Sequence, residues 1–325
     1  FYNEQDNEIT FWLNYMILAI GNINIDLICS VPRLPKPDDK IIVSRVETVP
    51  GGAACNFAIG VARLGSKASL FGHTGTDQNG ENALNSLLQE NIDISRVIRE
   101  PNSATGFVII LVDSNNGETI KIGYREANAL LDPKEITQEL LEGMALVHVA
   151  SVSAPIALKV AEMCQRLSIT SSIDFGGELM EASQEILRKI IKKYSIVFMN
   201  QIAWEKAFGM PPTNLDALQS PVKDDNKILN LTMGAKGSFI MTKNQVEFIP
   251  SWEVEVVDTT GAGDAFAAGF IHHHLQGMPL KEVGNRAAAC AALQITKPNA
   301  RDGMPTLKEV ERFLAINRNR NRNRN

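Results

Sequence analysis

Asp264 directly follows a short glycine-rich turn, and this position indicates phosphoryl chemistry. The β-branched run VEVV precedes DTTGAGD, and a helical pattern begins at Ala265. In such a strand–turn–helix unit, the backbone N–H groups of Gly261, Ala262 and Gly263 form an anion site at the helix N-terminus. A carboxylate there repels a resting phosphate, but it can accept a proton from an attacking hydroxyl while the N–H groups hold the developing negative charge. The alternative is an acid favoured only by the helix dipole.

A second glycine motif, PGGAACNFAIGVARLG, occupies residues 50–65. Gly51 and Gly52 end a strand-like run, and Asn56 lies in the first turn of the helix that follows, among small residues that let a ligand approach. Backbone groups and one amide are suited to binding hydroxyl groups. A structural turn that packs a helix closely on a sheet has the same pattern, so this motif alone leaves both interpretations open.

From Met16 onward, short β-branched runs alternate with amphipathic segments of helical length, which is typical of β-α units on a largely parallel sheet. Strand patterns cover residues 17–23, 145–150, 169–174, 194–200 and 227–233. Helical periodicity covers Cys55–Leu64, Asn79–Glu90, Pro155–Leu167, Ala182–Lys193, Ala265–Leu275 and Val283–Ile295. The predicted fold is therefore α/β and doubly wound, with helices on both faces of the sheet.

Two stretches break this alternation and predict a small β-lid. Leu27–Pro50 contains four prolines, and Ser103–Tyr124 has the pattern of a hairpin around Asn115, Asn116 and Gly117. The predicted domain covers residues 16–316. Residues 1–15 are interpreted as an N-terminal extension and residues 317–325, NRNRNRNRN, as a disordered low-complexity tail.

The composition excludes several classes of function. The chain has 325 residues, of which 44% are hydrophobic and 21% charged, as in an ordinary globular protein. A net charge of −5 gives no broad attraction to nucleic acid or an anionic membrane, and no apolar stretch reaches the roughly 20 residues that span a bilayer. The four cysteines lack C-x-x-C spacing. We expect a small-molecule partner and a reducing, cytoplasmic location.

Together the motifs resemble the PfkB, or ribokinase-like, carbohydrate kinase family. GGAACNFA, followed by Gly65 and Gly75, is similar to the N-terminal signature of that family, and DTTGAGDAFAAG is similar to the C-terminal one. GNINID, FGHTGTDQNGE, TMGAKGS and KPNARDGMPT extend the likeness over Met16–Phe313. The resemblance implies a ribokinase-like fold whose β-lid covers the sugar and often forms a dimer contact, so a homodimer through the lid is expected.

The resemblance also implies roles for individual residues. Asp264 would be the catalytic base, and the backbone of residues 261–263 the anion hole. The positions that match substrate contacts are Asn24, Asp26, Gly52 and Asn56. Arg125 ends the predicted lid hairpin, where it would cap a sugar, stack on a base or lie at a solvated edge.

The nucleotide side of the family matches TMGAKGS, in which Thr232, Gly234 and Gly237 would leave room for ribose and phosphate, although an ordinary turn has the same pattern. Asn299 stands where the family has a glycine near the adenine, and asparagine tolerates the left-handed conformation. The positions that match a potassium-type site are Asp258 and Thr260. The implied cofactors are ATP, Mg²⁺ and K⁺.

The family's N-x-x-E motif, which helps to order Mg²⁺, is incomplete in this chain. Asn200 is present, but the glutamate position is Ala203. Glu205 lies roughly 200° further around a helix and cannot simply replace that glutamate. Altered handling of magnesium is the expected consequence.

Two further departures concern the substrate. The ribokinase lysine and the sugar-contacting glutamate correspond to Ala53 and Ser151, which disfavours a strict ribokinase. No arginine follows Asp174 to hold a carboxylate, as one does in 2-keto-3-deoxygluconate kinases. The expected function is ATP-dependent phosphorylation of a hydroxymethyl group of a small sugar. A nucleoside kinase of the same family and a catalytically weak sensor of nucleotide and sugar are the alternatives.

Overall fold

The computed structural model describes residues 16–212 and 227–322, with side chains up to residue 317. Its centre is a sheet in the order β14-β13-β12-β11-β10-β9-β1-β4. The six strands from β4 to β12 pair in parallel, and β13 and β14 pair antiparallel. These strands are β1 (Met16–Gly21), β4 (Lys67–Phe71), β9 (Met144–Ala150), β10 (Thr170–Asp174), β11 (Ile196–Asn200), β12 (Ile228–Thr232), β13 (Ser238–Met241) and β14 (Val246–Ile249). The prediction of a doubly wound α/β fold with a largely parallel sheet is confirmed.

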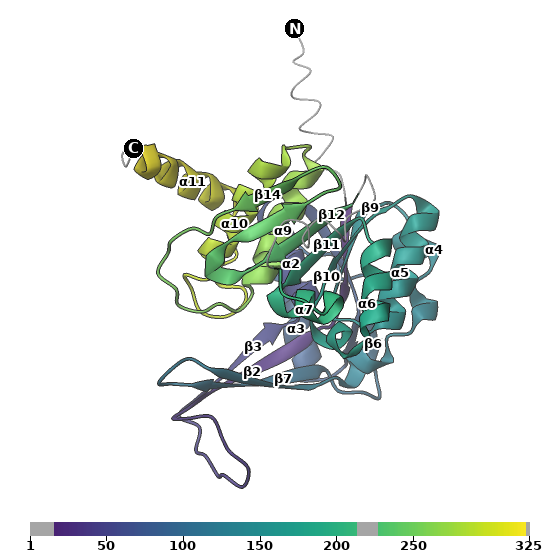
Figure 1. Cartoon of the computed structure of the whole chain (residues 1–325). Coiled ribbons are helices and arrows are strands. Elements are labelled where there is room, and N and C mark those ends of the chain that lie inside the picture. The colour runs from purple at the N-terminus through teal and green to yellow at the C-terminus, as the bar shows by residue number, and fades with distance from the viewer. Residues whose placement is uncertain (1–15, 213–226, 323–325) are drawn as a thin grey trace.

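Helices cover both faces of this sheet (Figure 1). One layer contains α4 (Gln138–Leu141), α5 (Ala154–Leu167), α6 (Gln184–Lys193) and α7 (Gln201–Phe208). The other contains α2 (Ala53–Arg63), α3 (Gln78–Gln89), α9 (Ala262–Leu275) and α10 (Leu280–Gln294). In β1, Leu18 and Ile20 pack in the core of the first layer, whereas Ile17 and Ala19 pack in the core of the second. A strand buried on both faces reads as a continuous apolar run, which explains the pattern in the sequence.

A second sheet projects from the body and forms the lid, at the lower left of Figure 1. It has the order β3-β2-β7-β8 and consists of β2 (Asn24–Val31), β3 (Arg45–Gly51), β7 (Gly106–Asp113) and β8 (Thr119–Tyr124). Its strands extend the segment expected over 27–50 by a few residues at each end, and β7 begins three residues after Ser103. The small strands β5 (His73–Gly75) and β6 (Ile98–Glu100) pair separately, outside the lid.

The helices expected from periodicity occur within three residues of their predicted starts and one of their predicted ends. Periodicity missed α4, α7 and α11 (Leu307–Arg322). It also missed the 3-10 turns η1 (Glu126–Leu130), η2 (Pro133–Glu135), η3 (Gly177–Glu181) and η4 (Gly234–Lys236). The disordered tail was expected to start at residue 317, but α11 continues to Arg322, because extending an existing helix is easier than nucleating one. The N-terminal extension lies outside the described residues. Within 16–212 and 227–322, every helix is too short or too polar to cross a bilayer.

Candidate active site

The glycine turn ahead of Asp264 opens helix α9. Gly261 is the N-cap residue, with a left-handed φ of 78°, and a Cβ there would lie 2.5 Å from the carbonyl oxygen of Ala300. Glycine is therefore required by both conformation and space. Gly263 belongs to the helix and a Cβ there would meet open space, so the unusual conformation expected across 261–263 is confined to Gly261.

The N–H groups of this first turn are only partly free. The N–H of Ala262 donates to the carbonyl oxygen of Thr259 over 3.3 Å, whereas those of Gly261 and Gly263 have no backbone partner in the described chain. Free N–H groups at a helix start attract anions. The turn thus has the donors that an anion hole needs, with Gly263 exposed at its mouth.

The carboxylate of Asp264 bonds to the other glycine motif rather than capping its own helix. Its Oδ2 accepts a hydrogen bond of 2.8 Å from the Nδ2 atom of Asn56, which lies on α2 in the other glycine motif. Burial, together with the negative charge of Asp174, raises the pKa of Asp264 to about 7, against smaller opposing effects of Asn56, Arg301 and Lys121. A carboxyl with this pKa is poised to take up a proton near neutral pH.

A second carboxylate stands at the base of the lid. Asp26 lies on β2, and its carboxyl group sits over Gly51, where a Cβ would be only 2.4 Å from the carboxyl carbon. The carboxylate of Asp26 accepts no hydrogen bond within the described part of the chain, so its oxygen atoms are available to a ligand. Burial raises its pKa to about 6, and Arg301 and Lys121 oppose that shift.

The neighbouring Asn24 is held by a residue that the motifs did not reveal. Asn128 is buried, and its Nδ2 atom donates to Asn24 Oδ1 over 2.8 Å while its Oδ1 accepts the N–H of Ile23 over 2.9 Å. The side-chain oxygen of Asn24 is therefore engaged by the protein. Gly52 is the N-cap residue of α2, which places the helix of Asn56 at the edge of this site.

The lid contributes basic side chains. Asp26, Ile110 and Lys121 belong to one face of the lid sheet, because register pairs Asp26 with Val108 and Ile110 with Lys121. Lys121 acts electrostatically on both Asp26 and Asp264, so this face looks toward the site. Arg125, predicted to contact substrate, forms an ion pair with Glu178 in η3 and so joins the end of the lid to the body.

A cavity of about 650 Å³ lies on the other side of the glycine turn. It is lined by Thr232, Gly234 and Gly237 of the TMGAKGS motif, by Ala262 and Gly263, and by apolar side chains that include Trp252 and Phe266. The TMGAKGS motif and the glycine turn, which were predicted separately, therefore line the same cavity. A largely apolar hollow with a few polar groups is the usual form of a small-molecule site.

Two residues predicted for the nucleotide side do not line that cavity. Asn200 is the N-cap residue of α7, and its Oδ1 accepts the N–H of Ala203 over 2.8 Å. Ala203 is fully buried, so a glutamate at that position would displace core packing. Asn299 has a left-handed φ of 64°, as expected for a position where the family has a glycine.

The residues proposed for a monovalent cation are already bonded within the protein. The carboxylate of Asp258 accepts the N–H groups of Thr260 and Asn299, at 2.9 and 3.0 Å. The buried amide Nε2 of Gln294 donates to the carbonyl oxygen atoms of Thr260 and Asn299, at 3.0 and 2.6 Å. Each of these oxygen atoms therefore already accepts one N–H group of the protein, and a cation here would have to share them.

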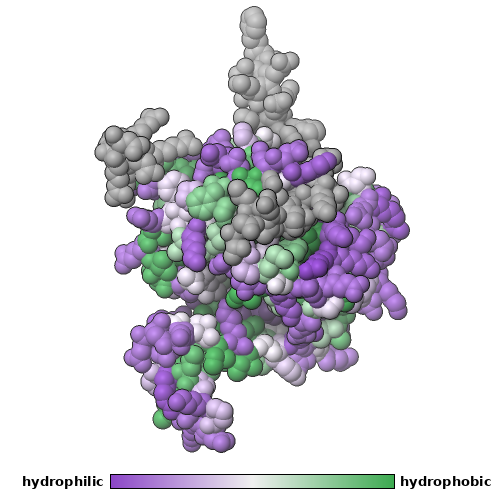
Figure 2. All heavy atoms as spheres, in the orientation of Figure 1, coloured by the Kyte–Doolittle hydropathy of each residue, from purple (hydrophilic) through white to green (hydrophobic). Residues whose placement is uncertain are grey.

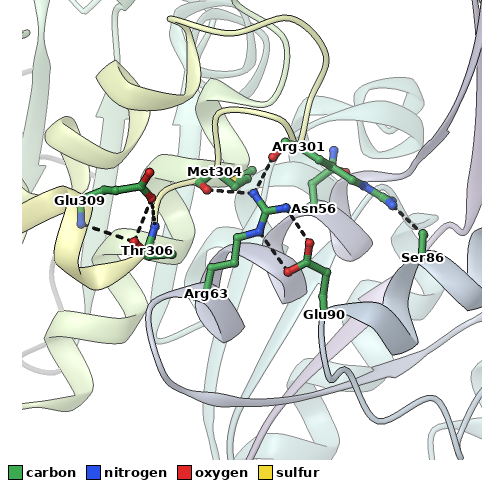
Figure 3. A network of polar contacts seen from close by, with 8 residues as sticks. All are labelled: Asn56, Arg63, Ser86, Glu90, Arg301, Met304, Thr306 and Glu309. Atoms are coloured by element: carbon green, nitrogen blue, oxygen red, sulfur yellow. Dashed lines mark hydrogen bonds and ion pairs between the residues drawn. The ribbon is translucent and has the colours of Figure 1, made fainter.

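Arg301 is the main feature of the site that the sequence did not reveal. It lies between α10 and α11, and its guanidinium reaches the glycine motif of residues 50–65, more than two hundred residues away in sequence (Figure 3). Nε donates to Asn56 Oδ1 and Nη2 to the carbonyl oxygen of Gly51, both at 2.8 Å, and Nη1 donates to Ser86 Oγ at 3.1 Å. KPNARDGMPT carried no signal for this role, because an arginine in a loop is ordinarily a surface residue.

The chain is similar to known proteins in both sequence and fold. The nucleoside kinase of Methanocaldococcus jannaschii is 29% identical over 91% of this chain and 96% of its own length, and its crystal structure superposes with a TM-score of 0.79 over 93% and 98% of the two chains. The deoxyribokinase of Salmonella typhi is 26% identical over 93% and 99%. Arabidopsis thaliana ribokinase, in a structure with ribose and ATP, is 24% identical and shares the fold with a TM-score of 0.81 over 93% and 98%.

Fold and relatives define a ribokinase-like kinase of sugars or nucleosides. A profile described as pfkB family carbohydrate kinase matches residues 14–307, and the chain belongs to that family.

Proposed function

We propose that this protein transfers the γ-phosphoryl group of ATP to a hydroxymethyl group of a small sugar or of the sugar part of a nucleoside. The observation that carries the proposal is the position of Asp264, between the 650 Å³ cavity lined by Gly263 and the hydroxyl-binding groups at the base of the lid. A phosphoryl group at the start of α9 and a hydroxyl held near Asp26 would meet beside its carboxylate.

In this proposal Asp264 accepts the proton of the attacking hydroxyl, and the free N–H groups of the α9 start stabilise the charge on the transferring group. The sugar hydroxyls are bound by Asp26, by the Asn24 amide and by backbone at Gly52. The lid would exclude water, which otherwise accepts the phosphoryl group.

Magnesium would neutralise charge on the phosphates of ATP during transfer. Within residues 16–212 and 227–322, His, Cys, Asp and Glu side chains form no group of three that could hold a metal ion. This fits an ion bound chiefly by nucleotide phosphates and water, which is common for Mg²⁺. Since Ala203 is buried and Asn200 caps a helix, the N-x-x-E region of this chain offers no carboxylate in place of the missing glutamate.

The lid is also the surface through which we propose that two copies of the chain associate. The face opposite Lys121 is apolar, and Val46, Ile120, Ile122 and Tyr124 are exposed on it. Figure 2 shows hydrophobic surface on the lid below the body of the molecule. A monomeric mass in solution at assay concentration would contradict this association.

The four cysteines are free, which supports the proposal of a reducing, cytoplasmic location.

The test is a coupled assay of ADP release over a panel of sugars and nucleosides, with the wild type and Asp264→Asn. We expect turnover with at least one acceptor, and a kcat that falls by roughly 10²- to 10⁴-fold in the variant because the proton acceptor is lost. ATP should still bind, which isothermal titration measures. Ligand binding without turnover on any acceptor would favour the sensor instead. Unchanged kcat with a lowered Tm would show that Asp264 only supports the helix.

A further inference from the structure

Arg301 bridges three segments that the chain brings together at the site. Its side chain contacts the end of β3 at Gly51, the first turn of α2 at Asn56 and the last turn of α3 at Ser86. The guanidinium is planar and presents its donors in a fixed fork, so three simultaneous bonds hold these acceptors in one arrangement. A lysine ammonium also has three donors, but they share one nitrogen atom and lack the spread of the planar fork.

The bond to Asn56 determines which way the Asn56 amide points. Because Arg301 can only donate, its Nε must face the amide oxygen of Asn56, and the Nδ2 atom is then turned toward Asp264. A rotated amide would put its NH₂ group against the guanidinium and its oxygen against a carboxylate, and both contacts would be repulsive. The order of contacts is therefore Arg301, Asn56, Asp264.

We propose that Arg301 is a positioning residue for phosphoryl transfer, which acts through Asn56 to orient the proton-accepting carboxylate of Asp264 and to favour its ionised form. Arg301 itself touches neither reacting group. The inference rests on the proposed role of Asp264 as base and extends it to a residue outside both signature motifs.

The charges around Asp264 give the expected direction. Asp174 on β10 raises its pKa, as does burial, while Arg301 and Lys121 on β8 lower it, and Asp26 on β2 and the Cys55 thiol lie close by. Loss of Arg301 removes one of the two nearby cations and frees the Asn56 amide. Both changes favour the protonated carboxyl, so the pKa of Asp264 should rise further.

The direction of the effect on activity follows from this rise in the pKa. A general base must be ionised, so kcat/KM for the acceptor should rise with pH through the pKa of Asp264 and level off above it. Without Arg301 this rise should occur at higher pH. Arg301→Met should move it upward by about one pH unit, which by itself lowers kcat/KM at pH 7 roughly 5-fold. Lost orientation of the Asp264 carboxylate should bring the total loss to roughly 10- to 100-fold. Arg301→Lys keeps the charge but not the fork, so we expect a smaller pH shift with a reduced plateau.

Arg63 offers a matched control in the same network (Figure 3). It pairs with Glu90 and donates to the carbonyl oxygen atoms of Arg301 and Met304, at 2.8 and 2.9 Å, so it anchors the same loop. It makes no contact with Asn56. Arg63→Met should therefore lower the Tm without moving the pH profile.

The experiment measures kcat/KM against pH for wild type, Arg301→Lys, Arg301→Met, Arg63→Met, Asn56→Ala and the Arg301→Met/Asn56→Ala double variant. It also follows the Asp264 carboxyl by ¹³C NMR titration, assigned with Asp264→Asn, which needs no turnover. The expected result is an upward shift in the Arg301 variants and in Asn56→Ala but not in Arg63→Met, with little further effect of Arg301→Met once Asn56 is gone.

Three outcomes would overturn the proposal: an unmoved Asp264 titration in Arg301→Lys and Arg301→Met, an equal shift in Arg63→Met, or fully additive effects of Arg301→Met and Asn56→Ala. These outcomes are distinct from failure of the proposed function, in which the wild type itself turns over no acceptor. If Arg301→Met does not fold, Arg301→Lys and Arg63→Met still decide the question.

Discussion

The two halves of the site present different kinds of groups to a ligand. On the nucleotide side the groups that face the cavity are largely backbone and small residues, at Gly234, Gly237 and Gly263. On the proposed acceptor side they are the charged and amide side chains of Asn24, Asp26, Asn56 and Asp264. Asn128 holds Asn24, and Arg301 holds Asn56. A phosphate is similar in every substrate and can be bound by backbone N–H groups, whereas an acceptor must be recognised hydroxyl by hydroxyl.

The largest effect expected from this comparison is at Gly261, where the two halves meet. Gly261→Ala places a Cβ against the carbonyl oxygen of Ala300 and on a left-handed backbone, which displaces the first turn of α9. We expect kcat to fall by roughly 10²- to 10³-fold, as when one donor to a developing charge is lost. The Tm should fall as well.

Gly263→Ala is the control for that prediction, because a Cβ there meets open space. The methyl group would enter the cavity without straining the protein. It should leave the Tm unchanged and raise the KM for ATP only. If both variants behaved alike, the special role of Gly261 in the turn would be wrong.

A smaller effect is expected on the acceptor side. Asp26→Asn keeps the shape but removes a charged acceptor from the substrate hydroxyls, so kcat/KM for the acceptor should fall roughly 10- to 100-fold. The Kd for ATP, measured by titration calorimetry, should not change. A loss of ATP affinity equal to the loss of acceptor affinity would contradict the division of the site into two halves.

The same difference explains how much could be predicted from sequence. Backbone sites leave short local signatures, so both glycine motifs, five strands of the central sheet and most helices were predicted. The strand expected at VEVV was wrong, because residues 254–257 are irregular, and β4, β13 and β14 were missed. Arg301, Asn128 and Glu178 act across long separations in the chain, and their neighbouring residues carry no pattern. The family resemblance assigned Asp258 to a potassium-type site, but it gave no sign that this carboxylate accepts the backbone N–H groups of Thr260 and Asn299.

The smallest effect concerns potassium, where we expect none in the wild type. The amide of Gln294 donates to the carbonyl oxygen atoms of Thr260 and Asn299 and thus ties together the loops that a cation would otherwise join. Exchanging K⁺ for tetramethylammonium at equal ionic strength should leave kcat and both KM values within about twofold. A twofold change corresponds to less than the free energy of one hydrogen bond.

In Gln294→Ala the carbonyl oxygen atoms of Thr260 and Asn299 lose their donor while remaining close to each other. Turnover should fall there, and K⁺ should restore part of it, because a cation can satisfy two carbonyl oxygen atoms as an N–H pair does. Strong activation of the wild type by K⁺ would contradict this expectation. It would mean that the ion displaces the Gln294 amide from these oxygen atoms and that the loop depends on potassium.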